Sequence, residues 1–456
     1  MNSVLLIYPY LKPTYDRSVF RFPPLGIAYI AAGLKKEGYK VQLLDCTYLN
    51  QRKAFNLAVA AKADVVGIYG MVTLSENALE FARKLRSQTK LLIAGGPLPT
   101  CDPLPFLEVF DIVVSGEGEQ TILQLLQAYQ MGSDLFSVPG IIFRKTLPGI
   151  AAEPFQVITT KAQPFEKNLD RIPFPGRDLL PNKEYQEHGR KKSGYAITTI
   201  MSTRGCPYQC EFCSNVIFGG SYRERSAKNV VAEIEQVLGM GYDRISFADD
   251  VFTLNKKRVL EICAAIRKRN LHFKWECLGR VDSLDAATAF AMKKAGCFRI
   301  YFGIESGNQR ILDLIHKQIT VQQARDAVET AHQAGMEVGA FFIIGYPGDT
   351  NDTILETLHF ANTLPLDYLG LTLPYPLPGT PLFERVKTSI HRDWHPRENV
   401  FSTHILIFEA GFSPFKLQFG IFKGRMQHLL KKQFGERSSF SSSFEKLTDW
   451  VFRKLK

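Results

Sequence analysis

The chain has 456 residues, of which 45% are hydrophobic and 22% are charged. That length and composition are typical of a soluble protein with two or three domains. No apolar run approaches the ~18 residues that span a bilayer. No basic segment with a cleavage site follows Met1, so we expect no signal peptide. The 8 cysteines, three of them clustered, favour a reducing cytoplasm and a metal centre.

The net charge of +11 is concentrated in the C-terminal tail. Residues 385–456 contain 14 Lys and Arg residues against 6 Asp and Glu residues, so the tail carries +8 of the total. A segment this basic favours an acidic partner: a lipid headgroup, a phosphate-bearing substrate or an acidic redox protein. A solvated basic surface without a partner has the same composition, so both interpretations stay open.

Strand and helix patterns alternate over residues 1–140. The predicted strands are 4–8, 41–44, 65–69, 91–94 and 112–114, and the predicted helices are 25–37, 76–87 and 119–130. This rhythm predicts an α/β domain with right-handed crossovers and a doubly wound parallel sheet, whose ligands bind over the carboxyl ends of the strands. The turn from Gly116 to Gly118 lacks the third glycine of a dinucleotide fingerprint and lies too late in the domain for one.

A second alternating pattern begins at Gly194. Its predicted strands are 196–201, 244–248, 273–278, 299–303, 337–344 and 368–374, and its predicted helices are 227–238, 256–269, 283–295, 321–334 and 353–364. Six such units over residues 194–384 predict a partial (β/α)6 barrel with its chemistry at the carboxyl ends of the strands. Residues 141–193 are rich in proline and charge, which predicts an irregular linker or strap. The extension at 385–456 is basic and aromatic, with predicted helices at 415–434 and 444–455 joined by a serine-rich hinge at 438–443.

Three cysteines lie close together at C-x3-C-x2-C spacing: Cys206, Cys210 and Cys213. Four thiolates normally hold a four-iron cluster, so three ligands leave one iron open to an exogenous molecule. A structural zinc site normally has four ligands in C-x2-C pairs, so it would need a fourth ligand from Cys263, Cys277 or Cys297. A disulfide does not suit this spacing in a chain without marks of secretion.

Polar residues follow three of the predicted barrel strands: Asp249 and Asp250, Glu305 and Ser306, and the turn from Gly345 to Asp349 that contains Pro347. Carboxylates at this height accept hydrogen bonds from an ammonium group or a ribose hydroxyl. Asp250 is equally suited to cap the next helix.

Together with Phe212 just before the last cysteine, this ordered set resembles the radical S-adenosylmethionine (SAM) enzymes. The resemblance implies that the open iron chelates the amino and carboxylate groups of SAM. One electron then splits SAM into methionine and a 5′-deoxyadenosyl radical. It also implies a set of SAM contacts: Phe212, Asp249, Asp250, Glu305, Ser306, Gly345 and Pro347.

The glycine-rich loops of the first domain resemble the cobalamin-binding domain that precedes many radical SAM barrels. The expected contacts are Gly26, Met71, Thr73, Gly95, Gly96, Pro97, Thr100, Gly116, Glu117 and Glu119. All 9 histidines lie at position 188 or later, so no histidine of this domain is available to ligate cobalt from below. The resemblance implies that the nucleotide tail enters between the glycine-lined strand ends. For any single glycine, a tight turn is an equally good explanation.

The resemblance covers roughly residues 1–385 and implies a cobalamin-dependent radical SAM enzyme, most simply a C-methyltransferase. One SAM would methylate reduced cobalt, and a second would yield the radical that removes a substrate hydrogen. Three alternatives remain open. They are a cyclase or rearrangement enzyme with the same cofactors, like the anaerobic enzyme that makes the fifth ring of chlorophyll; a tRNA-modifying radical SAM enzyme; and a non-catalytic cobalamin or iron–sulfur sensor.

We expect a small-molecule or lipid-like substrate, acidic if the tail recognises it, and a low-potential electron donor such as flavodoxin or ferredoxin. The tail is too apolar for a nucleic-acid module, so we expect no nucleic-acid partner. Its aromatic and basic helices suit peripheral attachment to a membrane surface in the cytoplasm. Alternatively, they pack on the barrel mouth, cover the active site and bury those aromatic residues.

Overall fold

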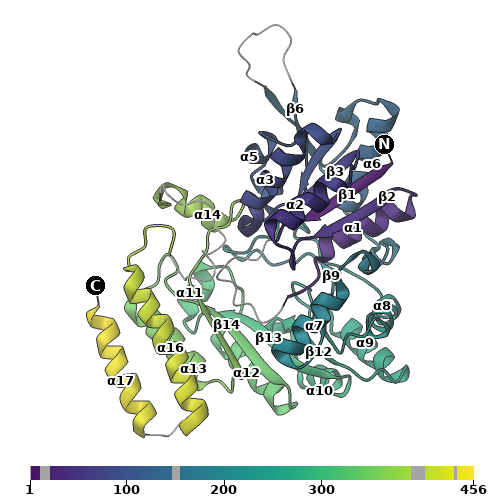
Figure 1. The fold of residues 1–456 in the computed structure, drawn as a ribbon. Coiled ribbons are helices and arrows are strands. Elements are labelled where there is room, and N and C mark those ends of the chain that lie inside the picture. Colours follow the sequence, from purple (N-terminus) through teal and green to yellow (C-terminus); the bar gives the residue numbers. More distant parts are fainter. Residues whose placement is uncertain (1, 11–20, 146–154, 392–405, 436–438, 456) are drawn as a thin grey trace.

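The computed structural model describes residues 2–10, 21–145, 155–391, 406–435 and 439–455. Figure 1 shows two sheet-containing lobes, the purple-to-blue first domain and the teal-to-green barrel, with a yellow helix pair on the outside of the barrel. Among the described helices, none is both long enough and apolar enough to cross a membrane.

The first sheet has seven strands in the order β2-β1-β3-β4-β5-β6-β7. Its strands are β1 Ser3–Tyr8, β2 Lys40–Asp45, β3 Val65–Tyr69, β4 Leu91–Gly95, β5 Ile112–Val114, β6 Ile141–Lys145 and β7 Gln156–Thr159. The pairs among β1 to β5 are parallel, which confirms the predicted doubly wound sheet. Strands β6 and β7 add antiparallel pairs, so the sheet extends beyond the domain end expected at residue 140.

Helices cover both faces of this sheet. They are α1 Leu25–Lys36, α2 Gln51–Ala60, α3 Ser75–Leu85, α4 Pro97–Cys101, α5 Leu104–Leu107 and α6 Gly118–Met131. Alternate residues of β1 enter two separate cores, as the period of two requires. Leu5 packs in the core that contains Phe81 of α3, whereas Leu6 packs in the core that contains Leu34 of α1. The sequence did not predict α2, which begins after an Asn50 cap.

The expected strap contains a helix where we predicted only irregular structure. Helix α7 spans Asn182–Ser193 and buries only Tyr185 and Gly189, so its sequence has no apolar stripe to reveal it. The Tyr185 hydroxyl donates to Asp45 at 2.6 Å and lies 3.0 Å from the Thr47 hydroxyl. The strap is therefore fastened to the carboxyl end of β2.

The second sheet is an open, all-parallel partial barrel in the order β15-β14-β13-β12-β11-β8, as predicted. Its strands are β8 Ile197–Ile200, β11 Arg244–Phe247, β12 Lys274–Gly279, β13 Cys297–Glu305, β14 Glu337–Ile343 and β15 Tyr368–Thr372. Its helices are α8 Ala227–Gly239, α9 Lys256–Lys268, α10 Ala286–Lys294, α11 Gln309–Leu314, α12 Val321–Gln333 and α13 Asn351–Thr363. A separate two-stranded sheet pairs β9 Thr203–Arg204 with β10 Arg223–Glu224.

The C-terminal extension packs on the edge of the barrel. Helix α14 spans Pro381–Val386, α16 spans Pro414–Phe434 and α17 spans Ser439–Lys454. Helix α16 contacts α13, α17 and the edge strand β15. Helix α16 comes closest to β15 at Gly424, where an added Cβ would lie 2.5 Å from Leu371 of that strand.

Two predictions about this extension were wrong. Most of the serine-rich stretch is not a hinge, because α17 already begins at Ser439. The alternative in which the pair buries its aromatic residues was wrong for three of them, since Phe415, Phe422 and Trp450 are 65%, 52% and 60% exposed, whereas Phe452 is buried. The inner face of α16 packs through glycine, aliphatic, lysine and glutamine residues, so its exposed aromatic residues form an apolar stripe on the outer face.

Candidate active site

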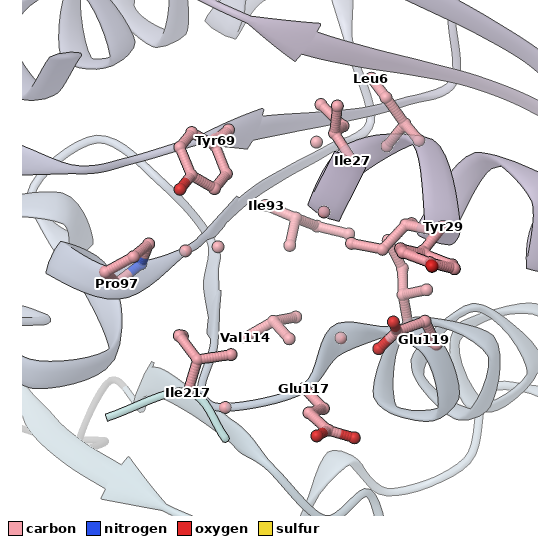
Figure 2. A pocket seen from close by; sticks show the side chains of 18 of the residues that line it. Leu6, Ile27, Tyr29, Tyr69, Ile93, Pro97, Val114, Glu117, Glu119 and Ile217 are labelled. Carbon is pink, nitrogen blue, oxygen red and sulfur yellow. The ribbon is translucent and has the colours of Figure 1, made fainter. Parts of the chain in front are cut away.

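A cavity of about 260 Å³ opens at the carboxyl ends of the first sheet. Figure 2 shows side chains from the strands and from α1 and α6 surrounding it, with Tyr69 and Pro97 on one side and Tyr29 and Glu119 on the other. Most of the lining is aliphatic or glycine. The full lining is Leu6, Gly26, Ile27, Tyr29, Ile30, Gly67, Ile68, Tyr69, Ile93, Gly95, Gly96, Pro97, Val114, Gly116, Glu117, Gly118, Glu119, Ile122, Met201, Arg204, Ile217 and Phe218.

Packing within the protein explains why some positions that line this cavity must be glycine, but it does not explain all of them. Gly96 is required by its turn, because its φ is +114° and an added Cβ would lie 2.5 Å from the Gly70 carbonyl oxygen. By contrast, a Cβ on Gly26 would meet no atom within 4 Å, and one on Gly95 would meet none closer than 3.9 Å. Their missing side chains keep the cavity open, which fits a ligand part inserted between the strand ends, such as the nucleotide tail of cobalamin.

Seven of the ten residues predicted to contact cobalamin line this cavity: Gly26, Gly95, Gly96, Pro97, Gly116, Glu117 and Glu119. Three do not. Thr100 Oγ1 accepts a hydrogen bond from the Gly116 amide at 3.2 Å and shapes the neighbouring turn. Met71 precedes the short 3-10 turn Val72–Leu74, which contains Thr73.

The three clustered cysteines lie in the loop between β9 and β10. Burial raises the pKa of Cys206, and it raises the pKa of Cys213 to about 12, with further contributions from the neighbouring thiols. All three are free thiols in one loop, as the predicted cluster requires. Cys263, Cys277 and Cys297 are packed in the hydrophobic core of the barrel.

Glu211, between Cys210 and Phe212, ties the cysteine loop to the far side of the barrel. Its carboxylate accepts a hydrogen bond from the Tyr346 hydroxyl at 2.7 Å and lies 3.1 Å from Arg385 Nε. The Glu211 amide donates to the carbonyl oxygen of Ile315 at 3.0 Å. Sequence reasoning missed this residue, because nothing in the cysteine motif indicates a partner in the turn after β14 or on α14.

Glu305 ends β13 in a left-handed conformation with φ of +74°, which is costly for a residue other than glycine and typical of functional sites. Its carboxylate lies 2.9 Å from Lys317 Nζ, and both side chains are buried. The ammonium group of Lys317 is 5.9 Å from the centre of the Phe212 ring. Sequence reasoning also missed Lys317. Burial opposes its charged form, but the Glu305 carboxylate and, after it, Cys210 raise the pKa of Lys317 above its usual value.

The two aspartates after β11 have different surroundings. Asp249 accepts hydrogen bonds from the amides of Ser202 at 2.6 Å and Thr203 at 3.0 Å, so it braces the root of the cysteine loop. The exposed Asp250 accepts a backbone hydrogen bond from Gly205, and its charge helps to raise the pKa of both Cys206 and Cys213. Asp250 is not a helix cap, because α9 is capped by Asn255.

The remaining predicted SAM contacts lie at the ends of β13 and β14. Ser306 is buried with its hydroxyl 2.9 Å from that of Thr357, so it has a protein partner. Gly345 has a φ of +80° and lies beneath Leu417 of α16. Pro347 lines a second cavity, of about 300 Å³, together with Tyr346 and Arg385.

The first cavity extends beyond its own domain. Met201 and Arg204, just before the cysteines, and Ile217 and Phe218, just after them, form its wall on the barrel side. The segment that carries the cysteines therefore closes the glycine-lined cavity, and the two predicted cofactor sites adjoin each other.

Comparisons with known proteins agree with this arrangement. Residues 200–361 match the radical SAM superfamily, and residues 12–126 match the B12 binding domain. The uncharacterized methyltransferase PH0819 of Pyrococcus horikoshii is 35% identical over 392 residues, covering 84% of this chain and 82% of that protein. The anaerobic magnesium-protoporphyrin IX monomethyl ester cyclase of Rubrivivax gelatinosus is 29% identical over 398 residues, covering 84% and 70%.

Two solved structures share the fold. The radical SAM methyltransferase TsrM from Kitasatospora setae, with cobalamin and a [4Fe–4S] cluster bound, has a TM-score of 0.70 at 19% identity and covers 85% of this chain and 75% of that one. The cobalamin-dependent radical SAM enzyme OxsB has a TM-score of 0.76 at 17% identity and covers 99% and 72%. The cofactors of this protein are a [4Fe–4S] cluster, SAM and cobalamin, and the chain belongs to the radical SAM superfamily, among the members that carry a B12 binding domain before the radical SAM domain.

Proposed function

We propose that this protein is a C-methyltransferase that moves a methyl group to an unactivated carbon of a small-molecule substrate. The observation that carries the proposal is the shared wall between the two cofactor sites. Met201, Arg204, Ile217 and Phe218 of the cysteine segment border the cavity of the B12 binding domain. A reaction that uses a radical from one cofactor and a methyl group from the other needs such adjacency. The 35% identical relative bears the name methyltransferase.

We assign the cluster to Cys206, Cys210 and Cys213, the cysteines of the loop between β9 and β10. When bound, the cluster supplies an electron to SAM, and cobalamin carries the methyl group. The protein contributes positioning: Glu211 holds the loop against β14, and Asp249 holds its root against β11. These buried anchors fix the thiols before any cofactor arrives.

We assign the methionine end of SAM to the polar group around Glu305. Lys317 suits the carboxylate of SAM, while Glu305 and Asp250 suit its ammonium group, because each offers the opposite charge beside the cysteine loop. We assign the adenosine to the glycine turn after β14, with Gly345 and Pro347, because this turn follows a strand end of the same barrel. Phe212, whose ring lies near Lys317, closes the site from the loop.

The decisive experiment is anaerobic reconstitution with iron, sulfide and cobalamin, followed by SAM and a strong reductant. We expect 5′-deoxyadenosine and S-adenosylhomocysteine together, with a change in the cobalamin absorption spectrum. Deoxyadenosine alone, with cobalamin bound but no methyl consumed, would favour the cyclase-like alternative and overturn methyl transfer. If cluster-loaded protein formed neither product, both methyl transfer and the cyclase-like alternative would be overturned, and the non-catalytic sensor would remain.

Two variants make this experiment specific. Cys213→Ala should lose the cluster and all deoxyadenosine formation while still binding cobalamin in the first domain. The matched control is Cys263→Ala on α9, where the thiol is 2% exposed within the core. It should keep its iron and its activity, since a buried structural thiol contributes only packing.

The outward face of the C-terminal helices supports a further proposal, peripheral attachment to an anionic membrane surface. Phe415, Phe422 and Leu429 form a stripe at seven-residue spacing on α16 and are 65%, 52% and 56% exposed. Trp450 on α17 is 60% exposed. Lys416 and Lys423 of α16 are buried, and the exposed basic residues of the pair are Arg425, Lys432, Lys446, Arg453 and Lys454. Apolar side chains insert at the interface while lysine and arginine pair with lipid phosphates. Co-sedimentation with phosphatidylglycerol vesicles, but not with phosphatidylcholine vesicles, should be lost in Phe422→Ser/Trp450→Ser.

The same basic surface suits an acidic electron donor such as flavodoxin or ferredoxin, because complementary charge accelerates encounter. Its contribution is testable separately. Deoxyadenosine formation driven by reduced flavodoxin should fall steeply with salt, whereas formation driven by dithionite should not.

A further inference from the structure

Four charged side chains, three of them buried and Glu119 largely so, join the B12 binding domain to the root of the cysteine loop. Glu117 immediately precedes α6 and Glu119 lies in its first turn, whereas Arg204 and Arg223 are directly paired residues of β9 and β10. Arg204 lies 2.6 Å from Glu119 and 3.2 Å from Glu117. Arg223 lies 2.5 Å from Glu117. The two acids and two bases balance, as buried charges must.

The two arginines differ in whether each of their terminal nitrogens has a hydrogen-bond acceptor. Arg223 uses both terminal nitrogens, donating to Glu117, to the Glu166 carbonyl oxygen at 3.1 Å and to the Phe218 carbonyl oxygen at 3.3 Å. Arg204 is 4% exposed, yet its Nη1 has no hydrogen-bond acceptor in line, although the Glu117 carboxylate is near. A buried charged donor without an acceptor is costly.

Arg204 also differs in position, because it lines the glycine-rich cavity and Arg223 does not. Its guanidinium lies 5.1 Å from the ring of Tyr29 and 5.3 Å from that of Phe218, and both rings border the same cavity. Figure 2 shows Glu117, Glu119 and Tyr29 at this end of the cavity. The rings and carboxylates hold the guanidinium in place in the cavity wall, where Nη1 lacks an aligned acceptor.

We propose that Arg204, a residue of the radical SAM domain, donates a hydrogen bond from Nη1 to an oxygen of the cobalamin held in the neighbouring domain. Cobalamin offers suitable acceptors in the amide carbonyls of the corrin and the phosphodiester of its nucleotide tail. Glu117, Glu119 and Arg223 are positioning residues that aim the guanidinium. Cobalamin affinity therefore depends on the barrel as well as on the B12 binding domain, and the root of the cysteine loop touches both cofactors.

The test compares Arg204→Lys with Arg223→Lys in the full-length, cluster-reconstituted chain. Both variants keep a positive charge facing the glutamates, but a lysine at 204 has one nitrogen and cannot reach a glutamate and the cavity together. We expect cobalamin affinity, measured by equilibrium dialysis, to fall about tenfold or more in Arg204→Lys, the loss of one charge-assisted hydrogen bond. Arg223→Lys disturbs the contact only indirectly, through the shared Glu117, so it should lower the affinity by clearly less than Arg204→Lys does.

Two further measurements separate this contact from a general loss of structure. Iron content and the thermal midpoint should match between the two variants. Glu119→Gln, which keeps the side-chain shape but weakens the hold on Arg204, should lower the affinity in the same direction and by less.

Cobinamide, which lacks the nucleotide tail, identifies the oxygen. A loss for both ligands points to the corrin, and a loss for cobalamin alone points to the phosphodiester. Unchanged cobalamin affinity in Arg204→Lys, or equal losses in the two arginine variants, would overturn the proposal. Cobalamin affinity is measured without methyl transfer. The proposed Arg204 contact can therefore be disproved while the proposed methyltransferase function stands, and the function can be disproved while the contact stands.

Discussion

Glu305 and Lys317 form a buried ion pair, 2.9 Å apart, at the carboxyl end of β13. Glu305 takes its left-handed φ of +74° at a register shift between β13 and β14, which turns its side chain into reach of the lysine. Such a pair costs desolvation and is weak evidence for stability. Its place beside Cys210 and Phe212 indicates a binding role instead.

The first prediction concerns Lys317→Met. Removing the ammonium group takes away the cation that we assign to the SAM carboxylate and leaves Glu305 as an unpaired buried acid. We expect SAM to bind at least about tenfold more weakly, since a charge-assisted hydrogen bond is lost. SAM affinity is measured by equilibrium dialysis, and the change in the cluster's EPR spectrum on adding SAM should shrink in parallel.

The control for this variant is Lys268→Met, at the exposed C-terminal end of α9. It removes the same charge away from the site and should leave SAM binding unchanged. Lys317→Arg should retain part of the affinity because the charge is kept. Equal SAM affinity in Lys317→Met and the wild type would show that the pair is structural only.

The second prediction concerns the glycine-lined cavity. Gly26→Ala adds a Cβ that meets no protein atom within 4 Å, and it removes a glycine from the first turn of α1. The free protein should therefore be slightly more stable, by about 0.5–1 kcal/mol. Its cobalamin affinity should nevertheless fall severalfold, because the new methyl group enters the cavity; Gly26→Val should lower it further.

Gly33 in the same helix is a matched control. An added Cβ there also meets no atom within 4 Å, but Gly33 does not line the cavity. Gly33→Ala should raise the thermal midpoint by a similar amount and leave cobalamin affinity unchanged. If Gly26→Ala and Gly33→Ala bound cobalamin equally well, the ligand would not occupy this end of the cavity.

The third prediction concerns Asp349, in the turn that follows β14. Burial raises the pKa of this carboxyl from 3.8 to about 6, although hydrogen bonds from Thr353 and the Tyr346 amide act in the opposite direction. The folded state therefore binds the proton more tightly than the unfolded state. The cost of ionising Asp349 is fully present above about pH 6 and is relieved as the pH falls toward 4.

Urea unfolding should detect this cost. The free energy of unfolding of the wild type, relative to Asp349→Asn, should rise by at most about 3 kcal/mol from pH 7 to pH 4, since one pKa unit is about 1.4 kcal/mol. Asparagine keeps one acceptor for the turn and does not titrate. A difference between the two proteins that stays constant with pH would contradict the raised pKa.

Much of the fold was predictable because its strands are short apolar runs ended by polar or glycine residues. β3 and β5 match their predictions residue for residue. Helix α7 was missed because it buries only two residues, and a helix without an apolar stripe has no period to detect. The direction in which the aromatic residues of α16 point stayed open, because composition cannot tell which face a helix presents.

The candidate site was predictable where the order of the strands carries the information. The cysteines, Asp250 and Glu305 follow the ends of β8, β11 and β13, and the parallel barrel brings such ends together. The missed residues are fixed instead by distant pairings. Glu211, for example, meets Tyr346 across 135 positions of sequence. A local sequence pattern does not indicate a contact between residues so far apart in the chain, and a single sequence carries no covariation signal.

The last prediction concerns the attachment of α17. Lys423 of α16 is fully buried, 2.7 Å from Asp449 of α17, and His359 of α13 lies 3.0 Å from the same carboxylate. Burial lowers the pKa of Lys423, and only Asp449 and Glu445 oppose that effect. Asp449→Asn leaves the ammonium group buried without a full counter-charge. It should loosen the helix pair by about 3–5 kcal/mol, the usual cost of breaking a buried ion pair from one side.

The matched control is Asp352→Asn, which breaks the exposed ion pair between Asp352 and Arg453 that also joins α13 to α17. With both partners more than half exposed, its loss should cost no more than about 1 kcal/mol. Hydrogen exchange across α16 and α17 should therefore accelerate strongly in Asp449→Asn and barely in Asp352→Asn. Equal rates in the two variants would mean that apolar contacts, such as those of Phe452 with Gly420, hold the pair on the barrel without help from the buried charge.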